Sequence, residues 1–163
     1  MTKRIQNAID IFLDAINNGT LAAGTCTACA VGNLVAAGIG YEIDKDFNSF
    51  VKLKNDTLKV KPNAAWMAAF SSSREAIIGY TKEDGLKNIE ATDFTLEEIL
   101  KIERAFERNT RISYGRYYEF SKKEIRADQI KGLEAIVKVM LTFDEQKENV
   151  KEIFTNRAEL IEV

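Results

Sequence analysis

Residues 25–38 form an uncharged stretch in which neither side is clearly suited to water. When the stretch is drawn at 3.6 residues per turn, valines and a leucine fall on one side, and cysteines, alanines and Asn33 fall on the other. Thr25 is suited to cap the start of a helix, and Gly38 is suited to end it in a left-handed conformation. The pattern predicts a short central helix over residues 25–38 that is buried on both faces.

Other segments repeat apolar residues at three- and four-residue spacing, which is the pattern of an amphipathic helix. Such helices are predicted over residues 3–17, from residue 95 to about 108, from 121 to about 142, and in a last segment that opens near Asp144. Residues 63–70 are expected to add one helical turn that faces the core.

Three predicted helix starts share one local signature, an aromatic residue followed by a hydroxyl residue and, three positions later, an acid. The hydroxyl residues are Thr81, Thr95 and Ser121. Each hydroxyl can accept from the amide of the third helical residue, whose acidic side chain can bind back to the amide of the capping residue. The signature therefore predicts a capped helix after each of these three residues.

The helical pattern is interrupted near residues 50–61, where apolar residues alternate with lysines on both sides of Asn55 and Asp56. These two residues suit a tight turn, so we predict a small β-hairpin insertion. A chain of 163 residues is long enough for one well-filled core. The predicted fold is mainly α, a single domain over residues 1–163 with about six helices around the central one.

Composition narrows the possible partners. The net charge is −2 and the isoelectric point is near 5.4, which argues against a surface that binds duplex nucleic acid throughout. No apolar run approaches the ~20 residues that cross a bilayer, and Asp10 and Asp14 interrupt the segment that a signal peptide would need. Two closely spaced cysteines cannot form a secreted disulfide framework, so we expect a cytoplasmic protein that does not bind membranes.

Cys26 and Cys29 form the most distinctive chemical pattern, and three interpretations compete. At the start of a helix, the dipole and free amides would lower the pKa of the Cys26 thiol, and Cys29 would resolve the resulting mixed disulfide. A metal site needs two further ligands, and the chain has no histidine and no third cysteine. We therefore predict no metal and no cofactor. In the third interpretation the cysteines are small apolar residues that permit close packing.

The Cys-x-x-Cys motif followed four residues later by the polar Asn33 resembles the active-site helix of the alkylhydroperoxidase D-like family. That resemblance implies thiol redox chemistry, but the family has histidine at the position of Asn33 and an upstream glutamate that this chain lacks before Cys26. The longer pattern Cys-Ala-Val-Gly-Asn, with Phe-Thr-Leu-Glu-Glu-Ile and Lys-Gly-Leu-Glu-Ala-Ile-Val, is similar to a family of small uncharacterised helical proteins of bacteria and phages. This second resemblance implies at most a sequestering or accessory role.

Asn33 needs a hydrogen-bond partner, because an unpaired buried amide costs roughly 1–3 kcal/mol. We expect its side chain to bind the backbone of a loop, since buried polar groups are usually satisfied within the protein. The functional alternative is that Asn33 orients a ligand above the cysteines.

The segment between Arg108 and Tyr118 combines arginines with tyrosines, and the next predicted helix begins with basic residues. Arginine pairs with phosphate or carboxylate through two parallel hydrogen bonds, and tyrosine stacks on bases. Free amides near Ser121 would add to anion binding. Alternatively, the arginines pair with acids of the preceding helix, and the tyrosines pack as a hinge. The predicted ligand-binding residues are Arg111, Tyr114, Arg116, Tyr117 and Lys122.

Acid pairs such as Glu103 and Glu107 fall on the polar face of a predicted helix, so we expect them in solvent rather than in acid–base catalysis. The chain has no calcium-binding loop of alternating aspartates and no phosphate-binding loop that ends in Gly-Lys-Ser/Thr. The absence of histidine excludes histidine-based triads and general bases.

Three function hypotheses follow. The first is a non-enzymatic cytoplasmic binding protein whose partner is an anionic small molecule, such as a nucleotide, or a protein. The second is a thiol–disulfide redox protein in which Cys26 and Cys29 are the catalytic pair. The third is a structural or assembly subunit, for which a homo-oligomer is the natural form.

Overall fold

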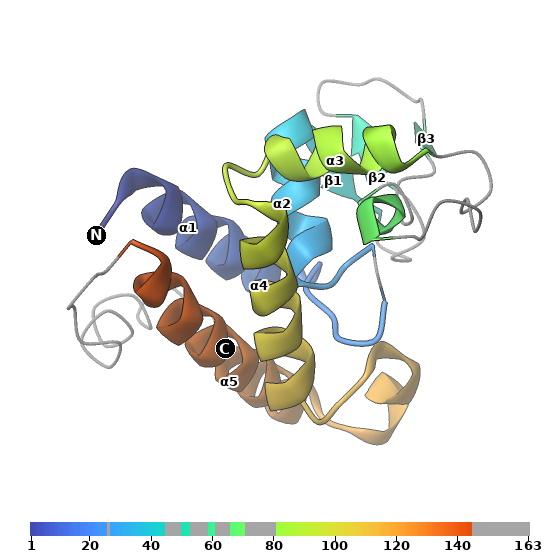
Figure 1. The fold of residues 1–163 in the computed structure, drawn as a ribbon. Coiled ribbons are helices and arrows are strands. Elements are labelled where there is room, and N and C mark those ends of the chain that lie inside the picture. The colour runs from blue at the N-terminus through green and yellow to red at the C-terminus, as the bar shows by residue number, and fades with distance from the viewer. Residues whose placement is uncertain (26, 45–49, 53–58, 61–65, 71–80, 145–163) are drawn as a thin grey trace.

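The computed structural model describes residues 1–25, 27–44, 50–52, 59–60, 66–70 and 81–144 (Figure 1). The predicted mainly α class is confirmed. In this part of the chain the α-helices are α1 (Lys3–Asn18), α2 (Ala30–Ile39), α3 (Lys82–Glu90), α4 (Leu96–Asn109) and α5 (Lys122–Phe143), and the 3₁₀ helices are η1 (Met67–Phe70) and η2 (Tyr114–Glu119). The helix predicted to open near Asp144 lies outside the described residues. No helix among those described combines the length and apolar character that a membrane crossing requires.

Helix α2 lies at the centre of the core, in contact with α1, α3 and α4, and the residues over its first seven positions are buried. The prediction that this helix begins after Thr25 is wrong, because α2 begins at Ala30. Cys29 has an extended backbone with ψ near 177°, and it caps the helix in place of Thr25. The preceding residues instead fold back, and the Ala22 amide donates to the Ala28 carbonyl at 2.8 Å.

The C-terminal end of α2 also differs from the prediction. The helix passes through Gly38 and ends at Ile39, where Gly40 caps it with a φ of +76°, the left-handed conformation that glycine adopts without strain. Gly38 is needed for a different reason. A Cβ atom there would collide with the backbone carbonyl of Ala91, which follows α3. The missing side chain at Gly38 therefore lets the end of α3 pack directly against α2.

All three predicted capping signatures are confirmed as complete capping boxes. In each, the side-chain oxygen of the capping residue accepts from the amide of the third helical residue. The carboxylate of that third residue accepts from the amide of the capping residue, and these distances lie between 2.9 and 3.2 Å. The pairs are Thr81 with Asp84, Thr95 with Glu98, and Ser121 with Glu124. These boxes explain why α3, α4 and α5 begin where the local sequence predicted.

A small antiparallel sheet lies beside α2, in the order β1 (Tyr41–Ile43), β2 (Phe50–Lys52) and β3 (Lys59–Val60). Strands β2 and β3 pair antiparallel, as predicted, but Phe50 lies opposite Val60. A two-residue turn at Asn55 and Asp56 would have placed Val51 there, so the observed register differs from the predicted one by one residue. The predicted turn at Asn55 and Asp56 lies outside the described residues. Strand β1 was not predicted, because three residues are too few to show a strand period.

Helices α4 and α5 pack side by side, and α1 packs against both α2 and α5 (Figure 1). Arg4 joins three of these helix ends. It donates to the Glu98 carboxylate at 2.8 and 2.9 Å, to Asp144 at 3.1 Å and to the Asp93 carbonyl at 3.1 Å. Hydrogen bonds from Arg4 also hold the pKa of Asp144 below its usual range. The start of α1 is thereby tied to the start of α4 and the end of α5.

Candidate functional site

The predicted basic and aromatic residues lie on η2 and on the segments that flank it. Tyr114 and Tyr117 meet edge to face, with ring centroids 5.7 Å apart. The Tyr117 hydroxyl accepts a hydrogen bond from the Gln129 amide at 3.3 Å, and burial raises the pKa of Tyr117. Tyr117 therefore holds η2 against α5, which matches the hinge alternative for this residue.

The predicted cations differ in the partners that they have within the protein. Arg116 donates to Glu119 at 2.7 Å and lies over the Phe120 ring, 5.3 Å from its centroid. Arg111 and Lys122 are exposed, and neither forms an ion pair within the described part of the chain. The structure thus brings Tyr114 and Tyr117 together but gives Arg116 a partner within its own helix.

Arg126, which the sequence placed with the basic residues of the following helix, is buried at 9% exposure rather than presented to solvent. The turn before η2 is held by a buried carboxylate instead. Asp128 accepts from the amides of Arg111 and Ile112 at 2.9 to 3.1 Å. The backbone at Arg111 is therefore fixed, while its side chain extends into solvent.

A second set of groups surrounds the segment that connects α1 to α2, residues 20–29, which we call the cysteine loop. Cys29 is fully buried, and its sulfur accepts from the Gly32 amide at 3.4 Å. The Asn33 amide donates to the carbonyls of Thr20, Ala28 and Cys29 at 3.0 to 3.1 Å. The expectation that Asn33 binds a loop backbone is confirmed, and Cys26 lies outside the described residues.

The cysteine loop is anchored to three other elements. The Gly24 amide donates to the Glu107 carboxylate of α4 at 3.3 Å, and the Tyr114 amide at the start of η2 donates to the Ala23 carbonyl at 2.8 Å. Gln129 of α5 donates to the Leu21 carbonyl. Figure 1 shows the loop next to α4 and on the side of η2. Segments far apart in the sequence therefore position the loop that carries the cysteines.

Glu103 of α4 faces Cys29. The pKa of Glu103 is raised to about 7, mainly by burial and also by the nearby Glu107 charge, while a hydrogen bond from the Cys29 thiol opposes the rise. The Glu103 Oε2 atom is buried and has no hydrogen-bond partner within the described part of the chain. Burial also raises the pKa of Glu107, opposed by the Gly24 amide. The expectation that Glu103 and Glu107 are solvated is wrong, because the cysteine loop covers this face of α4.

This arrangement has a definite chemical capacity. A carboxyl group that titrates near neutral pH can take up and release a proton under physiological conditions. Its neighbour is a thiol at the N-terminus of a helix, where the helix dipole and an amide donor stabilise a thiolate. Cys29 and Glu103 thus form a thiol–carboxyl pair. No cluster that could hold a metal ion occurs among the described residues.

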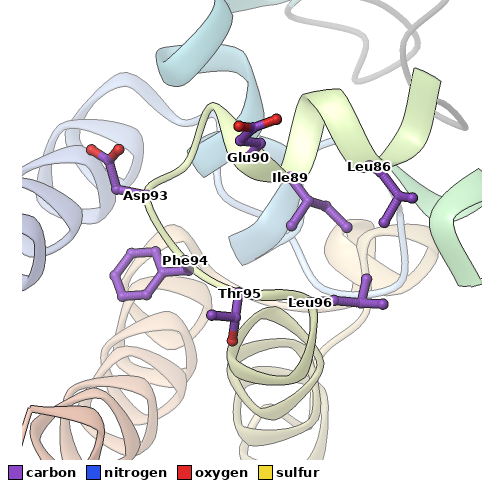
Figure 2. A pocket seen from close by; sticks show the side chains of 7 residues that line it. All are labelled: Leu86, Ile89, Glu90, Asp93, Phe94, Thr95 and Leu96. Carbon is purple, nitrogen blue, oxygen red and sulfur yellow. The ribbon is translucent and has the colours of Figure 1, made fainter. Parts of the chain in front are cut away.

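A separate hollow of about 390 Å³ lies where α3 turns into α4. Figure 2 shows Leu86 and Ile89 extending from α3 toward Leu96 at the start of α4, while the carboxylates of Glu90 and Asp93 point away from these three side chains. None of its lining residues was predicted as a site residue. The hollow has no thiol or cation in its lining, so it offers less chemistry than the thiol–carboxyl pair.

Replacing Glu103 with glutamine should flatten the pH dependence of stability. Because the folded pKa of about 7 lies above the reference value of 4.5, the folded state holds this proton more tightly. The contribution of Glu103 to stability is therefore full below pH 4.5 and is lost as the pH rises from 4.5 through 7, by on the order of 3 kcal/mol. Urea unfolding at several pH values should show Glu103→Gln more stable than the wild type at pH 8.

The matched control is Glu97→Gln, which changes an exposed acid on the same helix. This variant should keep the pH profile of the wild type. If the free energy of unfolding depends on pH in the same way for Glu103→Gln and the wild type, then folding does not raise the pKa of Glu103, and the prediction is wrong.

Comparison of the chain with protein-family models, with curated proteins and with solved structures finds no match.

Proposed function

We propose that this chain is a thiol–disulfide exchange protein in which Cys26 attacks a disulfide, Cys29 resolves the intermediate, and Glu103 accepts the Cys29 proton. The observation that carries the proposal is the buried Glu103 carboxyl, with a pKa of about 7, in hydrogen-bond contact with a buried thiol. Groups with strongly perturbed pKa values in contact with a nucleophile are typical of functional sites.

The burial of Cys29 supports different roles for the two thiols in this proposal. Its exposed fraction is 0%, so the sulfur of an external disulfide cannot reach it. The chain contains two cysteines in total, which leaves Cys26 as the attacking thiol. A resolving thiol has to meet only the neighbouring sulfur, so burial suits that role.

The reaction balances in two steps. The Cys26 thiolate, after losing its proton to solvent, attacks one sulfur of the substrate disulfide and releases the other as a thiolate. Cys29 then transfers its proton to the Glu103 carboxylate, and the Cys29 thiolate attacks the Cys26 sulfur. The second substrate thiolate leaves, the Cys26–Cys29 disulfide has formed, and the substrate has gained two electrons. Another thiol pair must later reduce the protein disulfide.

Local geometry supports the second step. The Gly32 amide points at the Cys29 sulfur, and the N-terminus of α2 adds its partial positive charge. Both favour the thiolate at the moment when the proton moves to Glu103. Asn33, which stands where the resembling family has histidine, binds three loop carbonyls, so in this proposal the carboxyl group replaces an imidazole as the proton acceptor.

The first sequence hypothesis, an anionic small molecule bound by the arginines and tyrosines, receives less support. Arg116 is already paired with Glu119, and Tyr117 is engaged by Gln129. The capping box of Ser121 and Glu124 engages two of the amides at the start of α5, which leaves fewer donors for a phosphate.

The test uses the full chain and dithiodipyridine, a small neutral disulfide whose released thiol is followed by absorbance. The wild type should release two thiols per chain and finish with a Cys26–Cys29 disulfide, which mass spectrometry detects as the loss of two hydrogens. Cys29→Ser should stop after one release with the probe attached at Cys26. Serine is a favourable capping residue, so this variant keeps the start of α2.

Glu103→Gln should leave the first release unchanged and slow the second about 100-fold at pH 7, the lower range of general acid–base effects. At pH 9 the thiol ionises without a base, and the variant should approach the wild-type rate. Glu97→Gln is the control. The proposal fails if Cys26→Ser reacts like the wild type, or if both cysteines react only after unfolding.

A further inference from the structure

The surface formed by η2 and the first turn of α5 presents cations and tyrosine rings to solvent. Tyr118 is 85% exposed and Tyr114 is 41% exposed. Arg111, Lys122 and Lys123 are exposed, and none of them forms an ion pair within the described part of the chain. We call these five residues the basic surface. Tyrosine and arginine are enriched where proteins bind one another, because both combine large contact area with hydrogen-bonding groups.

The chemistry of the basic surface favours an extended acidic partner over a compact phosphate ligand. The amides of Ser121 and Glu124 at the start of α5 are engaged in the capping box, so neither is open to a phosphate. The ring of Tyr114 is packed edge to face on Tyr117. The exposed Tyr118 ring and the exposed Arg111, Lys122 and Lys123 remain, and their charge and contact area suit an acidic peptide.

The basic surface adjoins the cysteine loop. Ala23 and Ser113 form a β-bridge, and the Tyr114 amide binds the Ala23 carbonyl at 2.8 Å. Gly24 lies so close that a Cβ atom there would be 3.0 Å from the Ser113 Cβ. A polypeptide that lies on the basic surface is therefore next to the loop that carries the proposed reactive thiols.

We infer that the basic surface docks an acidic segment of a partner protein, and that this partner carries the disulfide on which the thiols act. The identity of the partner as a disulfide substrate rests on the proposed function, whereas the docking itself rests on the exposed rings and cations. Docking would raise the concentration of a protein disulfide beside the cysteine loop, and a small neutral disulfide would gain nothing from it.

Two peptides test the inference with the full chain. The first is a short fluorescent peptide of alternating glutamate and leucine without cysteine, whose binding is measured by anisotropy. The variant Lys122→Glu/Lys123→Glu should weaken its affinity about 100-fold, at roughly tenfold for each reversed charge, and rising salt should weaken wild-type binding. The control Lys131→Glu/Lys138→Glu reverses two exposed charges farther along α5 and should leave the affinity unchanged.

The second peptide has the same sequence and carries a disulfide. The wild type should reduce it faster than Lys122→Glu/Lys123→Glu does, while both reduce dithiodipyridine at one rate. If the first peptide does not bind, or binds the variant and the control equally, or is displaced by ATP at a lower concentration than by free peptide, the docking inference is wrong. If the peptide binds as expected but neither disulfide is reduced, the docking surface stands and the proposed function is wrong.

Discussion

Replacing Asn33 with aspartate should lower the free energy of unfolding by about 3–5 kcal/mol, the cost of leaving a buried charge without a partner. The Asn33 side chain is 6% exposed, and its amide donates to the carbonyls of Thr20, Ala28 and Cys29. Aspartate keeps the shape of the side chain but has no donor, so its carboxylate would face three carbonyl oxygens. Urea unfolding at pH 7 measures the loss.

Asn109→Asp is the matched control. Its side-chain amide also donates to a helical carbonyl, that of Ala105 at 2.7 Å, but the residue is exposed. Water can solvate the new carboxylate there, so the loss should stay below about 1 kcal/mol. Equal losses for the two variants would show that the carbonyl cluster around Asn33 is not the source of the effect.

The second large effect is expected at Gly132, where α5 crosses α4. A Cβ atom at this position would lie 2.6 Å from the Thr110 Cγ2 atom and 2.7 Å from Cδ2 of the Phe106 ring. Phe106 is fully buried, so the ring has no free space to move into. Gly132→Val should therefore lower the free energy of unfolding by about 3 kcal/mol, the upper range for overpacking, despite the lower helix propensity of glycine.

Gly115→Ala is the control for Gly132→Val, because a Cβ atom at Gly115 has no neighbour within 4 Å. Thermal unfolding of both variants measures the difference between crowded and open positions. A melting temperature for Gly132→Val equal to that of the wild type would mean that α4 and α5 can separate at this crossing without cost, which contradicts their close packing.

The predictions that depend on near neighbours in the chain were the reliable ones. The boxes at Thr81, Thr95 and Ser121 need only a hydroxyl and an acid three residues later, so the local sequence contains every interacting group. The pairing of β2 with β3 is similarly local. The predicted start of α2 was wrong because the Asn33 side chain binds the carbonyls of Thr20, Ala28 and Cys29. These hydrogen bonds hold the residues before Ala30 in a loop instead of a helix.

Glu103 could not be identified from its helix alone. It borders the buried stripe of Ile99, Ile102 and Phe106, and an acid at the edge of such a stripe is ordinarily solvated. Its burial comes from the cysteine loop, which joins α1 to α2 and reaches α4 through the bond between Gly24 and Glu107. The one available signal was that the uncharged loop needs a surface to cover.

The amino-acid sequence by itself determined the helical class, the three capped helix starts, the paired strands and the presence of two nearby thiols, because each depends on residues a few positions apart. Tertiary structure alone decided that Cys29 is buried, that Glu103 lies against it with a raised pKa, and that the basic surface adjoins the cysteine loop. The physical reason is that burial and electrostatic coupling depend on which distant segments exclude water from a group, and this is set only when the helices pack.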